Sequence, residues 1–389
     1  MLTRRTFVQA AGFGAAAFIG ARGRENSLWS LVEPTLEAIE PGVICLASNE
    51  NPAGPGATVL DAVKTAFGPA GGRPGRYDGS SGALIEAIAK KQGVKPENVV
   101  LGCGSTQILR SCTHLFTAKD KPLVGTIPTY EECAGYAEMM GHPVRAVALD
   151  ANFKIDLDKF AAAARGAGLV FYCNPNNPTA TYVGARATRD FLAKVAKDTP
   201  DTYVLVDEAY YDYVTDPDHD THIPIAVENP RVLVARTFSK AYGMAGLRIG
   251  YAVGHPETIK KMAEWDAGSG TSSLNVLAMR AAIAAIQRDP SFVATERQRN
   301  KDVRDFTMKW FADRGMKPTD CQANFMFVNI GTPAKAFREA CRAKGVMVAR
   351  DFPPFHQTHA RISLGTMEEM QKAVQVFGDV LAKKSTAAA

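Results

Sequence analysis

Short apolar runs alternate with longer amphipathic segments along most of the chain, from residue 55 onward. The runs have the length and the β-branched and aromatic content of strands, whereas the segments between them have helical periodicity. The expected strands are Asn98–Cys103, Pro122–Thr126, Val144–Leu149, Leu169–Cys173, Tyr203–Val206, Arg231–Phe238 and Arg248–Val253. The expected helices include Leu84–Gln92, Thr106–Phe116, Ala187–Lys197 and Glu257–Trp265. This alternation predicts an α/β fold with a mainly parallel, seven-stranded sheet.

A second and smaller α/β set follows a long helical stretch from Leu274 to about Arg314. Its expected elements are the strand Phe325–Ile330, the helix Pro333–Lys344, the strands Val346–Arg350 and Arg361–Leu364, and the helix Met367–Lys383. A Gly/Ser-rich pause at Gly268–Ser273 separates the two sets. We therefore expect a large domain over residues 55–268 and a small domain over residues 269–389.

The composition agrees with a division into two domains and indicates which kind of molecule the protein binds. At 389 residues, of which 46% are hydrophobic, the chain is long enough for about two domains with substantial cores. The formal net charge is +5, but the two signs are interspersed and no long Lys/Arg block occurs. Neither nucleic-acid binding nor a polybasic membrane patch is indicated, and small molecules are the expected partners.

The first two dozen residues have a different character. Paired arginines, Arg4-Arg5, precede a weakly apolar Ala/Gly-rich run from Val8 to Ala21 that is too short for a stable membrane span. The pattern predicts a twin-arginine signal peptide over residues 1–23 and hence export, for example to the periplasm. An ordinary amphipathic extension, with a cytoplasmic protein, is the alternative. No sharp cleavage site is present, so that retention of the segment as an anchor stays open.

The cysteines and histidines do not indicate a disulfide framework or a metal site. The seven cysteines show no Cys-x-x-Cys spacing, and several lie in apolar runs where a buried thiol is the usual state. Free thiols also suit twin-arginine export, which carries proteins already folded in the reducing cytoplasm. The two paired histidine motifs, His219/His222 and His356/His359, lie in Pro- and Asp-rich loops without further ligands.

Polar clusters follow four of the expected strands. In open α/β sheets, ligands bind beyond the carboxyl ends of the strands. The clusters are Gly104-Ser105-Thr106, Asn174-Pro175-Asn176-Asn177-Pro178, Asp207-Glu208-Ala209-Tyr210 and the turn from Thr237 to Tyr251. The first of them opens a helix, where free backbone N–H groups favour an anion. Four such clusters together predict a ligand site at this edge of the sheet.

The last cluster is the most informative, because it places Lys240 beside Thr237 and Ser239, with Arg248 eight residues on. A lysine amine forms a Schiff base with an aldehyde when burial and cationic neighbours lower its pKa. The arginine and the hydroxyls suit a phosphate dianion. The turn therefore favours a cofactor that carries both an aldehyde and a phosphate.

Each of these signals also has a simpler explanation. Lys240 alone is compatible with a surface lysine next to a turn, and Ser105 or Thr106 with a plain N-cap. Asn177 is compatible with the end of a turn, and Asp207 with a strand-end carboxylate paired with an arginine. Gly102-x-Gly104 begins a dinucleotide fingerprint, but the third glycine is absent.

Taken together, the clusters resemble those of fold-type I pyridoxal-phosphate enzymes. Over about residues 40–384 the chain looks like a class I/II aminotransferase, similar to the histidinol-phosphate aminotransferase group. The resemblance implies pyridoxal 5'-phosphate as the cofactor, with Lys240 as its Schiff-base lysine. It implies that the phosphate is surrounded by Gly104, Ser105, Thr106, Thr237, Ser239 and Arg248. It also implies that Asp207 faces the pyridine nitrogen and that Tyr130 stacks on the ring. Tyr210 and Asn177 are expected to bond the ring hydroxyl.

The resemblance also implies substrate and subunit contacts. Arg361 matches the arginine that binds the substrate α-carboxylate, and Arg350 matches one that helps bind a distal phosphate. Asn49 belongs to a segment similar to the group's N-terminal signature, and residues 24–54 are expected to form an arm that joins the small domain. Tyr77 matches a tyrosine that the other subunit lends to the phosphate, which implies a homodimer with shared sites.

The expected reaction moves an amino group between an amino acid, or histidinol phosphate, and a 2-oxo acid. Two departures bear on the substrate. Thr106-Gln107 stands where the group commonly has an acidic residue, and Phe352-Pro353-Pro354-Phe355 adds apolar surface beside Arg350 that suits an aromatic side chain. Export also favours a substrate other than histidinol phosphate, which is a cytoplasmic intermediate. A pyridoxal-phosphate lyase or decarboxylase would share the cofactor residues, and a non-catalytic regulator would need a DNA-binding region for which residues 24–45 are too short.

Overall fold

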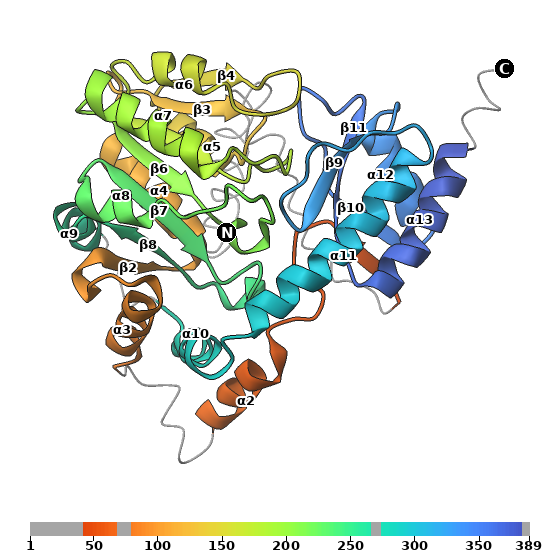
Figure 1. Cartoon of the computed structure of the whole chain (residues 1–389), viewed down its shortest axis with the longest axis horizontal. Coiled ribbons are helices and arrows are strands. Elements are labelled where there is room, and N and C mark those ends of the chain that lie inside the picture. The colour runs from red at the N-terminus through yellow and green to blue at the C-terminus, as the bar shows by residue number, and fades with distance from the viewer. Residues whose placement is uncertain (1–41, 68–78, 266–273, 383–389) are drawn as a thin grey trace, which may run out of the picture.

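The computed structural model describes residues 42–67, 79–265 and 274–382, and a seven-stranded sheet forms the centre of its larger part (Figure 1). The strands are β2 (Val99–Gly102), β3 (Leu123–Ile127), β4 (Val144–Ala148), β5 (Leu169–Cys173), β6 (Tyr203–Asp207), β7 (Val232–Thr237) and β8 (Gly250–Gly254). Their order across the sheet is β2-β8-β7-β6-β5-β3-β4. β8 runs antiparallel to both of its neighbours, β2 and β7, and the other adjacent pairs are parallel. The predicted α/β fold with a mainly parallel sheet is confirmed.

Helices cover both faces of this sheet. They are α2 (Gly56–Ala66), α3 (Ser80–Gln92), α4 (Gly104–Phe116), α5 (Glu132–Met139), α6 (Leu157–Ala163), α7 (Ala185–Asp198), α8 (Ile223–Glu228), α9 (Pro256–Trp265) and α10 (Val276–Arg288), with 3-10 turns η3 (Pro96–Asn98), η4 (Tyr211–Tyr213) and η5 (Ala245–Leu247). Successive strand residues point to opposite faces. Val204 and Val206 accordingly belong to one apolar cluster, whereas Leu205 belongs to the other. Burial on both faces explains why the strands read as continuous apolar runs.

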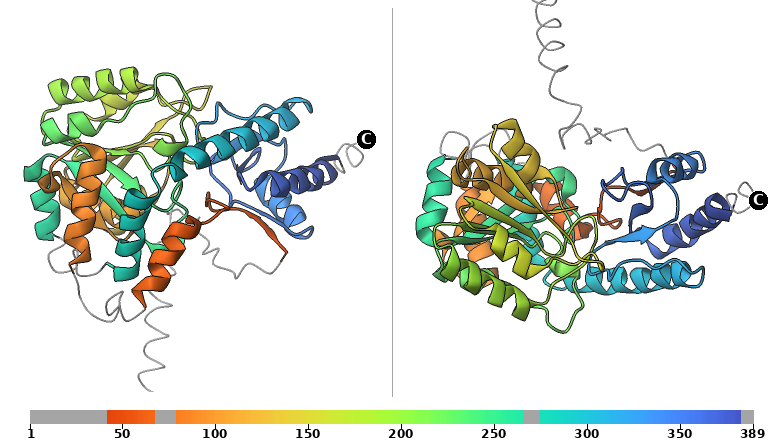
Figure 2. Two further views of the ribbon diagram at one scale, coloured as in Figure 1. Left: turned by 60° about the horizontal axis from the view of Figure 1, so that its bottom comes forward. Right: turned by 90° about the horizontal axis from the view of Figure 1, so that it is seen from above.

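The smaller part packs beside the carboxyl ends of the parallel strands (Figure 2). It contains the parallel pair β1 (Ile44–Leu46) and β10 (Val346–Val348), and the antiparallel pair β9 (Phe325–Asn329) and β11 (His359–Ser363). Its helices are α11 (Phe292–Ala312), α12 (Ala334–Arg342) and α13 (Met367–Ala382). Phe311, Phe337 and Phe377 are fully buried in its core. Through β1, the segment that precedes α2 contributes a strand to this part.

The helical stretch expected from Leu274 to Arg314 is two helices, α10 and α11, which meet at residues 289–291. Pro290 lies at this break, and the residue before a proline is disfavoured in helical conformation. Ala281 and Ala282 of α10 are buried in the core of the larger part, where α10 packs on α2 and α3. The expected start of the small domain at residue 269 is therefore too early, because the two cores divide after α10. The pause at 268–273 itself lies outside the described residues.

Several expected strands are also shorter than predicted, and two of these differences affect arginines of the candidate site. Arg248 adopts a left-handed conformation, with φ at 56°, so β8 begins only at Gly250. Likewise β10 ends at Val348, which leaves Arg350 in the following loop. Neither arginine is held by a ladder of strand hydrogen bonds.

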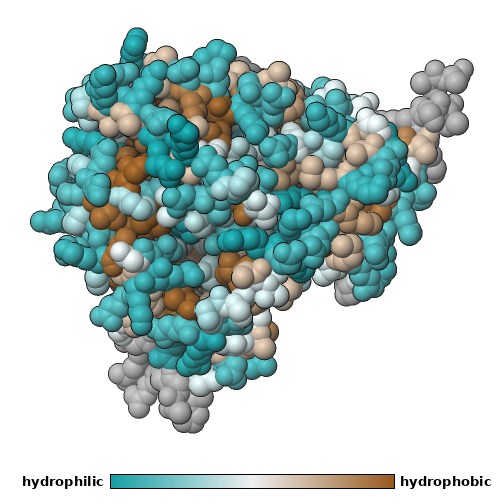
Figure 3. Space-filling view, in the orientation of Figure 1, coloured by the Kyte–Doolittle hydropathy of each residue, from teal (hydrophilic) through white to brown (hydrophobic). Residues whose placement is uncertain are grey.

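The surface is mixed in character. The face shown in Figure 3 is mostly hydrophilic, with hydrophobic residues in separate smaller areas. Among the described helices, none combines the length and the apolarity that crossing a membrane requires.

Candidate active site

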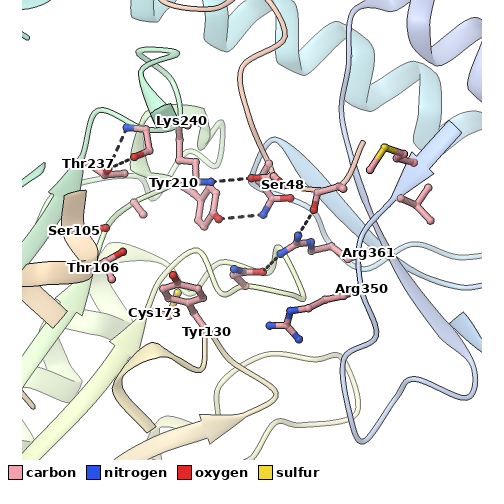
Figure 4. A pocket seen from close by; sticks show the side chains of 18 of the residues that line it. Ser48, Ser105, Thr106, Tyr130, Cys173, Tyr210, Thr237, Lys240, Arg350 and Arg361 are labelled. Atoms are coloured by element: carbon pink, nitrogen blue, oxygen red, sulfur yellow. Dashed lines mark hydrogen bonds between the residues drawn. The ribbon is translucent and has the colours of Figure 1, made fainter. Parts of the chain in front are cut away.

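A cavity of about 850 Å³ lies between the carboxyl ends of the parallel strands and the smaller part. Both parts of the molecule line it. The residues from the larger part and its loops are Ser105, Thr106, Tyr130, Cys173, Asn177, Asp207, Ala209, Tyr210, Thr237, Ser239, Lys240, Ala245 and Arg248. The smaller part and the segment before α2 contribute Ala47, Ser48, Asn49, Lys335, Arg338, Glu339, Arg342, Met347, Val348, Arg350 and Arg361. The strand-end clusters and the expected arginines therefore meet in one cavity (Figure 4).

Lys240 extends into this cavity from the turn after β7. Its Nζ donates a hydrogen bond to the carbonyl oxygen of Ser48, at 3.0 Å. Burial, with Arg361 as the next cause, lowers the pKa of Lys240 to about 8. A lysine with this pKa is substantially neutral near pH 8, and the neutral amine is the form that attacks an aldehyde or accepts a proton.

Asp207 is the last residue of β6, and its buried side chain lines the cavity. Its Oδ1 accepts a hydrogen bond from the backbone N–H of Ala209, at 3.1 Å. Burial raises the pKa of Asp207 to about 7. Within the part of the chain that the structure describes, no cationic side chain lies at ion-pair distance from it. A cationic group in the cavity would therefore be stabilised by this carboxylate.

An anion cradle lies where β7 and β8 approach the start of α4. Arg248 donates from Nη1 to Ser239 Oγ at 3.4 Å and from Nη2 to Thr106 Oγ1 at 3.3 Å. Thr237 Oγ1 donates to Ser239 Oγ at 2.9 Å. Gly104 begins α4 with φ at +67°, which strains any residue with a Cβ, and a Cβ there would lie 2.3 Å from Arg248 Nη2 and displace its guanidinium. Hydroxyls, a guanidinium and free helix N–H groups together suit a phosphate.

Tyr210 and Asn177 line the cavity, and each contacts a residue from outside the larger part, Asn49 and Arg361 respectively. The phenol of Tyr210 accepts a hydrogen bond from Nδ2 of Asn49, at 3.1 Å. Burial raises the pKa of Tyr210 above its usual value, so the hydroxyl keeps its proton. Asn49 is in turn held by Ser363, whose Oγ accepts from the Asn49 backbone N–H at 2.9 Å and donates to its Oδ1 at 2.7 Å.

Arg361 and Arg350 reach the cavity from β11 and from the loop after β10 (Figure 4). The buried Arg361 donates to Asn177 Oδ1 at 2.8 Å and to the carbonyl oxygen of Ala47. Its Nε has no hydrogen-bond partner among the described residues. Arg350 is different, because its Nη2 donates to the carboxylate of Glu131 at 2.6 Å.

A buried ion network behind β6 was not found from the sequence. The carboxylate of Glu208 accepts from Arg236 Nη2 at 2.6 Å, from Thr221 Oγ1 at 2.9 Å and from the backbone N–H of His222 at 2.9 Å. Although burial opposes ionisation, Arg236 and His222 lower the pKa of Glu208 to about 2. Glu208 is therefore a charged structural residue that fixes the end of β6, next to Asp207.

Of the site residues that the sequence predicts, Tyr77 lies outside the described residues. Ser105, Thr106, Tyr130, Asn177, Asp207, Tyr210, Thr237, Ser239, Lys240, Arg248, Asn49, Arg350 and Arg361 line the cavity, and Gly104 lies against Arg248. Sequence reasoning missed Glu131, the network of Glu208 and the α12 residues at the cavity. All seven cysteines are free thiols.

Residues 41–377 match the family model for aminotransferase class I and II. The chain belongs to this family. It is 36% identical, over 343 residues, to a histidinol-phosphate aminotransferase of Moorella thermoacetica, an alignment that covers 87% of this chain and 86% of the relative. A second histidinol-phosphate aminotransferase, from Halalkalibacterium halodurans, is 31% identical over 345 residues and is aligned over 90% of its length.

Solved structures agree with the fold of this class I/II aminotransferase. A putative histidinol-phosphate aminotransferase from Erwinia carotovora atroseptica superposes with a TM-score of 0.81 at 29% identity, over 88% of this chain and 97% of that one. A histidinol-phosphate aminotransferase from Sinorhizobium meliloti, in complex with pyridoxal 5'-phosphate, superposes with a TM-score of 0.80 at 25% identity, over 94% and 99% of the two chains.

The chain is a pyridoxal-phosphate-dependent aminotransferase, and its cavity fits that cofactor. The cradle around Arg248 suits the phosphate. The buried Asp207 lacks a cationic partner in the described residues, which suits a protonated pyridine nitrogen. The amine of Lys240, with its lowered pKa, suits the aldehyde.

Proposed function

We propose that the amino donor is an α-amino acid whose α-carboxylate binds Arg361, and that the acceptor is a 2-oxo acid. The supporting observation is the state of this guanidinium. Arg361 is buried in the cavity wall, and no acidic side chain lies at ion-pair distance from it within the described residues. Burial lowers its pKa, but only to about 10, so it remains charged at neutral pH. A buried, uncompensated guanidinium suits one carboxylate, which it can bind through two parallel hydrogen bonds.

Each residue then has a separate task. Bound pyridoxal phosphate supplies an electron sink for the Cα–H bond. Asp207 would hold a proton on the ring nitrogen of the bound cofactor, Tyr210 and Asn177 would bond its ring hydroxyl, and Tyr130 would stack on the ring. Arg361 would bind the α-carboxylate of the substrate and so orient its Cα–H bond for proton removal. The neutral amine of Lys240 would accept the proton from the substrate Cα and hold it for its return.

Histidinol phosphate is the competing donor, because relatives at 36% and 31% identity are named for it. The sequence favours an amino acid with an aromatic or other bulky side chain instead, through the apolar run Phe352–Phe355 beside Arg350. In the structure, Phe352 is buried against both guanidiniums, with its ring centre 4.7 Å from Arg361 and 4.4 Å from Arg350, and it is not among the residues that line the cavity. The proposed export of the protein would also separate it from a cytoplasmic intermediate.

A half-reaction assay distinguishes the two donors. Purified protein loaded with pyridoxal phosphate is mixed with phenylalanine, other amino acids or histidinol phosphate, and the loss of the visible cofactor band is followed. We expect conversion by phenylalanine or another amino acid, and its reversal by 2-oxoglutarate. An Arg361→Lys variant should lose at least about 10-fold in kcat/KM for amino acids, because an ammonium cannot bind a carboxylate bidentately. Turnover of histidinol phosphate but not of amino acids would refute the proposal.

We also propose that the protein is a homodimer with shared active sites, and that it is exported by the twin-arginine route. Support for both comes from the sequence, through Tyr77 and through Arg4-Arg5. Export is tested by cell fractionation after expression in a bacterium that has the route. Replacement of both arginines by lysine should move the protein from the periplasm to the cytoplasm. An unchanged distribution would argue against the signal.

A further inference from the structure

Arg350 forms an ion pair that the residue roles above do not use. Its Nη2 donates to Glu131 Oε2 at 2.6 Å, and its Nη1 donates to the carbonyl oxygen of Asp351 at 3.0 Å. Only 17% of the Arg350 side chain and 20% of the Glu131 side chain are exposed. Glu131 directly follows Tyr130 in the larger part, whereas Arg350 belongs to the smaller part. The pair therefore joins the two parts beside the cavity.

Arg350 and Arg361 are neighbours, but their positive charges have different partners. Both guanidiniums lie against the ring of Phe352, at 4.4 Å for Arg350 and 4.7 Å for Arg361. Arg361 has neutral partners, the side chain of Asn177 and the carbonyl of Ala47. Arg350 has the carboxylate of Glu131. Of these two guanidiniums, that of Arg361 has no acidic partner among the described residues, whereas that of Arg350 is already neutralised.

This arrangement affects which acidic group a substrate can carry on the carbon next to its amino-bearing carbon, a carboxylate or a phosphate ester. A carboxylate has one negative charge, and a single guanidinium satisfies it. A phosphate monoester carries up to two negative charges and three acceptor oxygens, so it requires a second cation. Histidinol phosphate has such an ester on the carbon that corresponds to the carboxyl carbon of an amino acid. The cation that shares the Phe352 ring with Arg361 is Arg350, and a dianion that approaches it meets the carboxylate of Glu131.

We propose that Glu131 determines specificity: by neutralising Arg350 it makes the site selective for a carboxylate over a phosphate ester. Like charges brought together in a partly buried site are costly, and mismatched charge is a common means of excluding the wrong ligand. Removal of the Glu131 charge would leave two adjacent, uncompensated guanidiniums, which is the arrangement that a phosphate dianion requires.

The test uses the holoenzyme with saturating pyridoxal phosphate, so that the cofactor's own phosphate site is filled. Half-reaction rates are measured with phenylalanine and with histidinol phosphate, and inorganic phosphate is titrated as a competitive inhibitor. In Glu131→Gln, we expect kcat/KM for histidinol phosphate to rise at least about 10-fold and the inhibition constant of phosphate to fall by a similar factor. The rate with phenylalanine should change less than about 3-fold.

Two further variants serve as controls. Glu138→Gln removes the same charge from an exposed position of α5 and should leave the preference unchanged. In Arg350→Gln, the added Glu131→Gln change should bring no gain for phosphate, because the cation that it releases is absent. The visible cofactor band of each variant shows that it has folded. An equal effect of Glu131→Gln on both donors, or a full gain in the Arg350→Gln background, would overturn the proposal.

The inference about Glu131 rests on the proposed function. The donor preference of the wild-type protein therefore distinguishes a failure of the proposed function from a failure of the inference alone. Wild-type protein that prefers histidinol phosphate to every amino acid refutes both proposals. Wild-type protein that uses amino acids, with a donor preference that Glu131→Gln leaves unaltered, refutes the role of Glu131 alone.

Discussion

At the scale of single residues, burial determines the chemistry of the site. The same apolar surroundings lower the pKa of Lys240 to about 8 and raise that of Asp207 to about 7. Both changes favour the neutral form of the side chain. The neutral amine of Lys240 can therefore react with an aldehyde, and the carboxyl group of Asp207 can bind a cation. The polypeptide supplies neither of these two groups at the site.

The pKa of Lys240 predicts how the apoprotein takes up its cofactor. Only the neutral amine attacks an aldehyde, so the rate of uptake should rise with pH and level off above about pH 8, the pKa of Lys240. Stopped-flow measurement of the visible band between pH 6 and pH 10 tests this. Lys240→Ala should form no such band, whereas Lys309→Ala, at an exposed position of α11, should behave as wild type. A band in Lys240→Ala that borohydride traps would remove the assignment of this lysine.

The raised pKa of Asp207 predicts that this residue lowers the stability of the apoprotein, although the enzyme needs it for activity. Its pKa is raised on folding, from 3.8 to about 7, so the folded apoprotein binds more protons than the unfolded chain between these values. The resulting destabilisation is absent below pH 3.8, grows by about 1.4 kcal/mol for each pH unit between the two values, and is complete above pH 7. Asp207→Asn should therefore stabilise the apoprotein more at pH 8 than at pH 5, as measured by urea unfolding. The loaded variant should lose at least about 100-fold in activity. A stability gain that does not change with pH would contradict this account.

At the scale of elements, the close approach of β8 to the start of α4 builds the phosphate cradle. A Cβ on Gly250 would lie 2.5 Å from the backbone nitrogen of Ser105 and 2.8 Å from the backbone carbon of Gly104. Gly250→Ala should push the two segments apart, destabilise the fold by about 1–3 kcal/mol and weaken pyridoxal-phosphate binding. Gly125→Ala, on β3 of the same sheet, is the control, since nothing lies within 4 Å of its added Cβ. Equal cofactor affinity in the two variants would refute the role of this contact.

The arrangement of the elements explains which parts of the site could be predicted from the sequence. Periodicity and strand-end polarity placed Asp207, Asn177 and Lys240 at one edge of the sheet, because parallel strands end together. The pairing of Glu131 with Arg350 could not be foreseen in this way, since 219 residues separate them and no local pattern connects them. The assignment of α10 failed for a related reason. Periodicity shows that α10 has an apolar face but not which core this face joins, and the fold shows that it packs on α2 and α3.

At the scale of the whole molecule, the cavity draws on both parts of the chain. Lys240 and Asp207 come from the larger part, whereas Arg361 and Arg350 come from the smaller one. The hydrogen bond from Asn49 to Tyr210 and the ion pair from Glu131 to Arg350 cross between them. Small displacements of one part would therefore change the substrate-binding side of the site and leave the phosphate cradle intact.

The proposed sharing of sites between subunits predicts complementation between two defective variants. Lys240→Ala removes the reactive amine, and Tyr77→Phe removes a hydrogen-bond donor to the phosphate of the site in which Tyr77 acts. If Tyr77 acts in the neighbouring subunit, a mixed dimer has one site with Lys240 of one chain and Tyr77 of the other, both intact. Unfolding and refolding an equal mixture should give about a quarter of wild-type sites, because half of the dimers are mixed and each has one intact site. Activity is assayed at a pyridoxal-phosphate concentration that leaves the Tyr77→Phe homodimer largely unloaded, and sedimentation confirms the dimer. Failure of the mixture to exceed the sum of its components would show that Tyr77 serves its own chain.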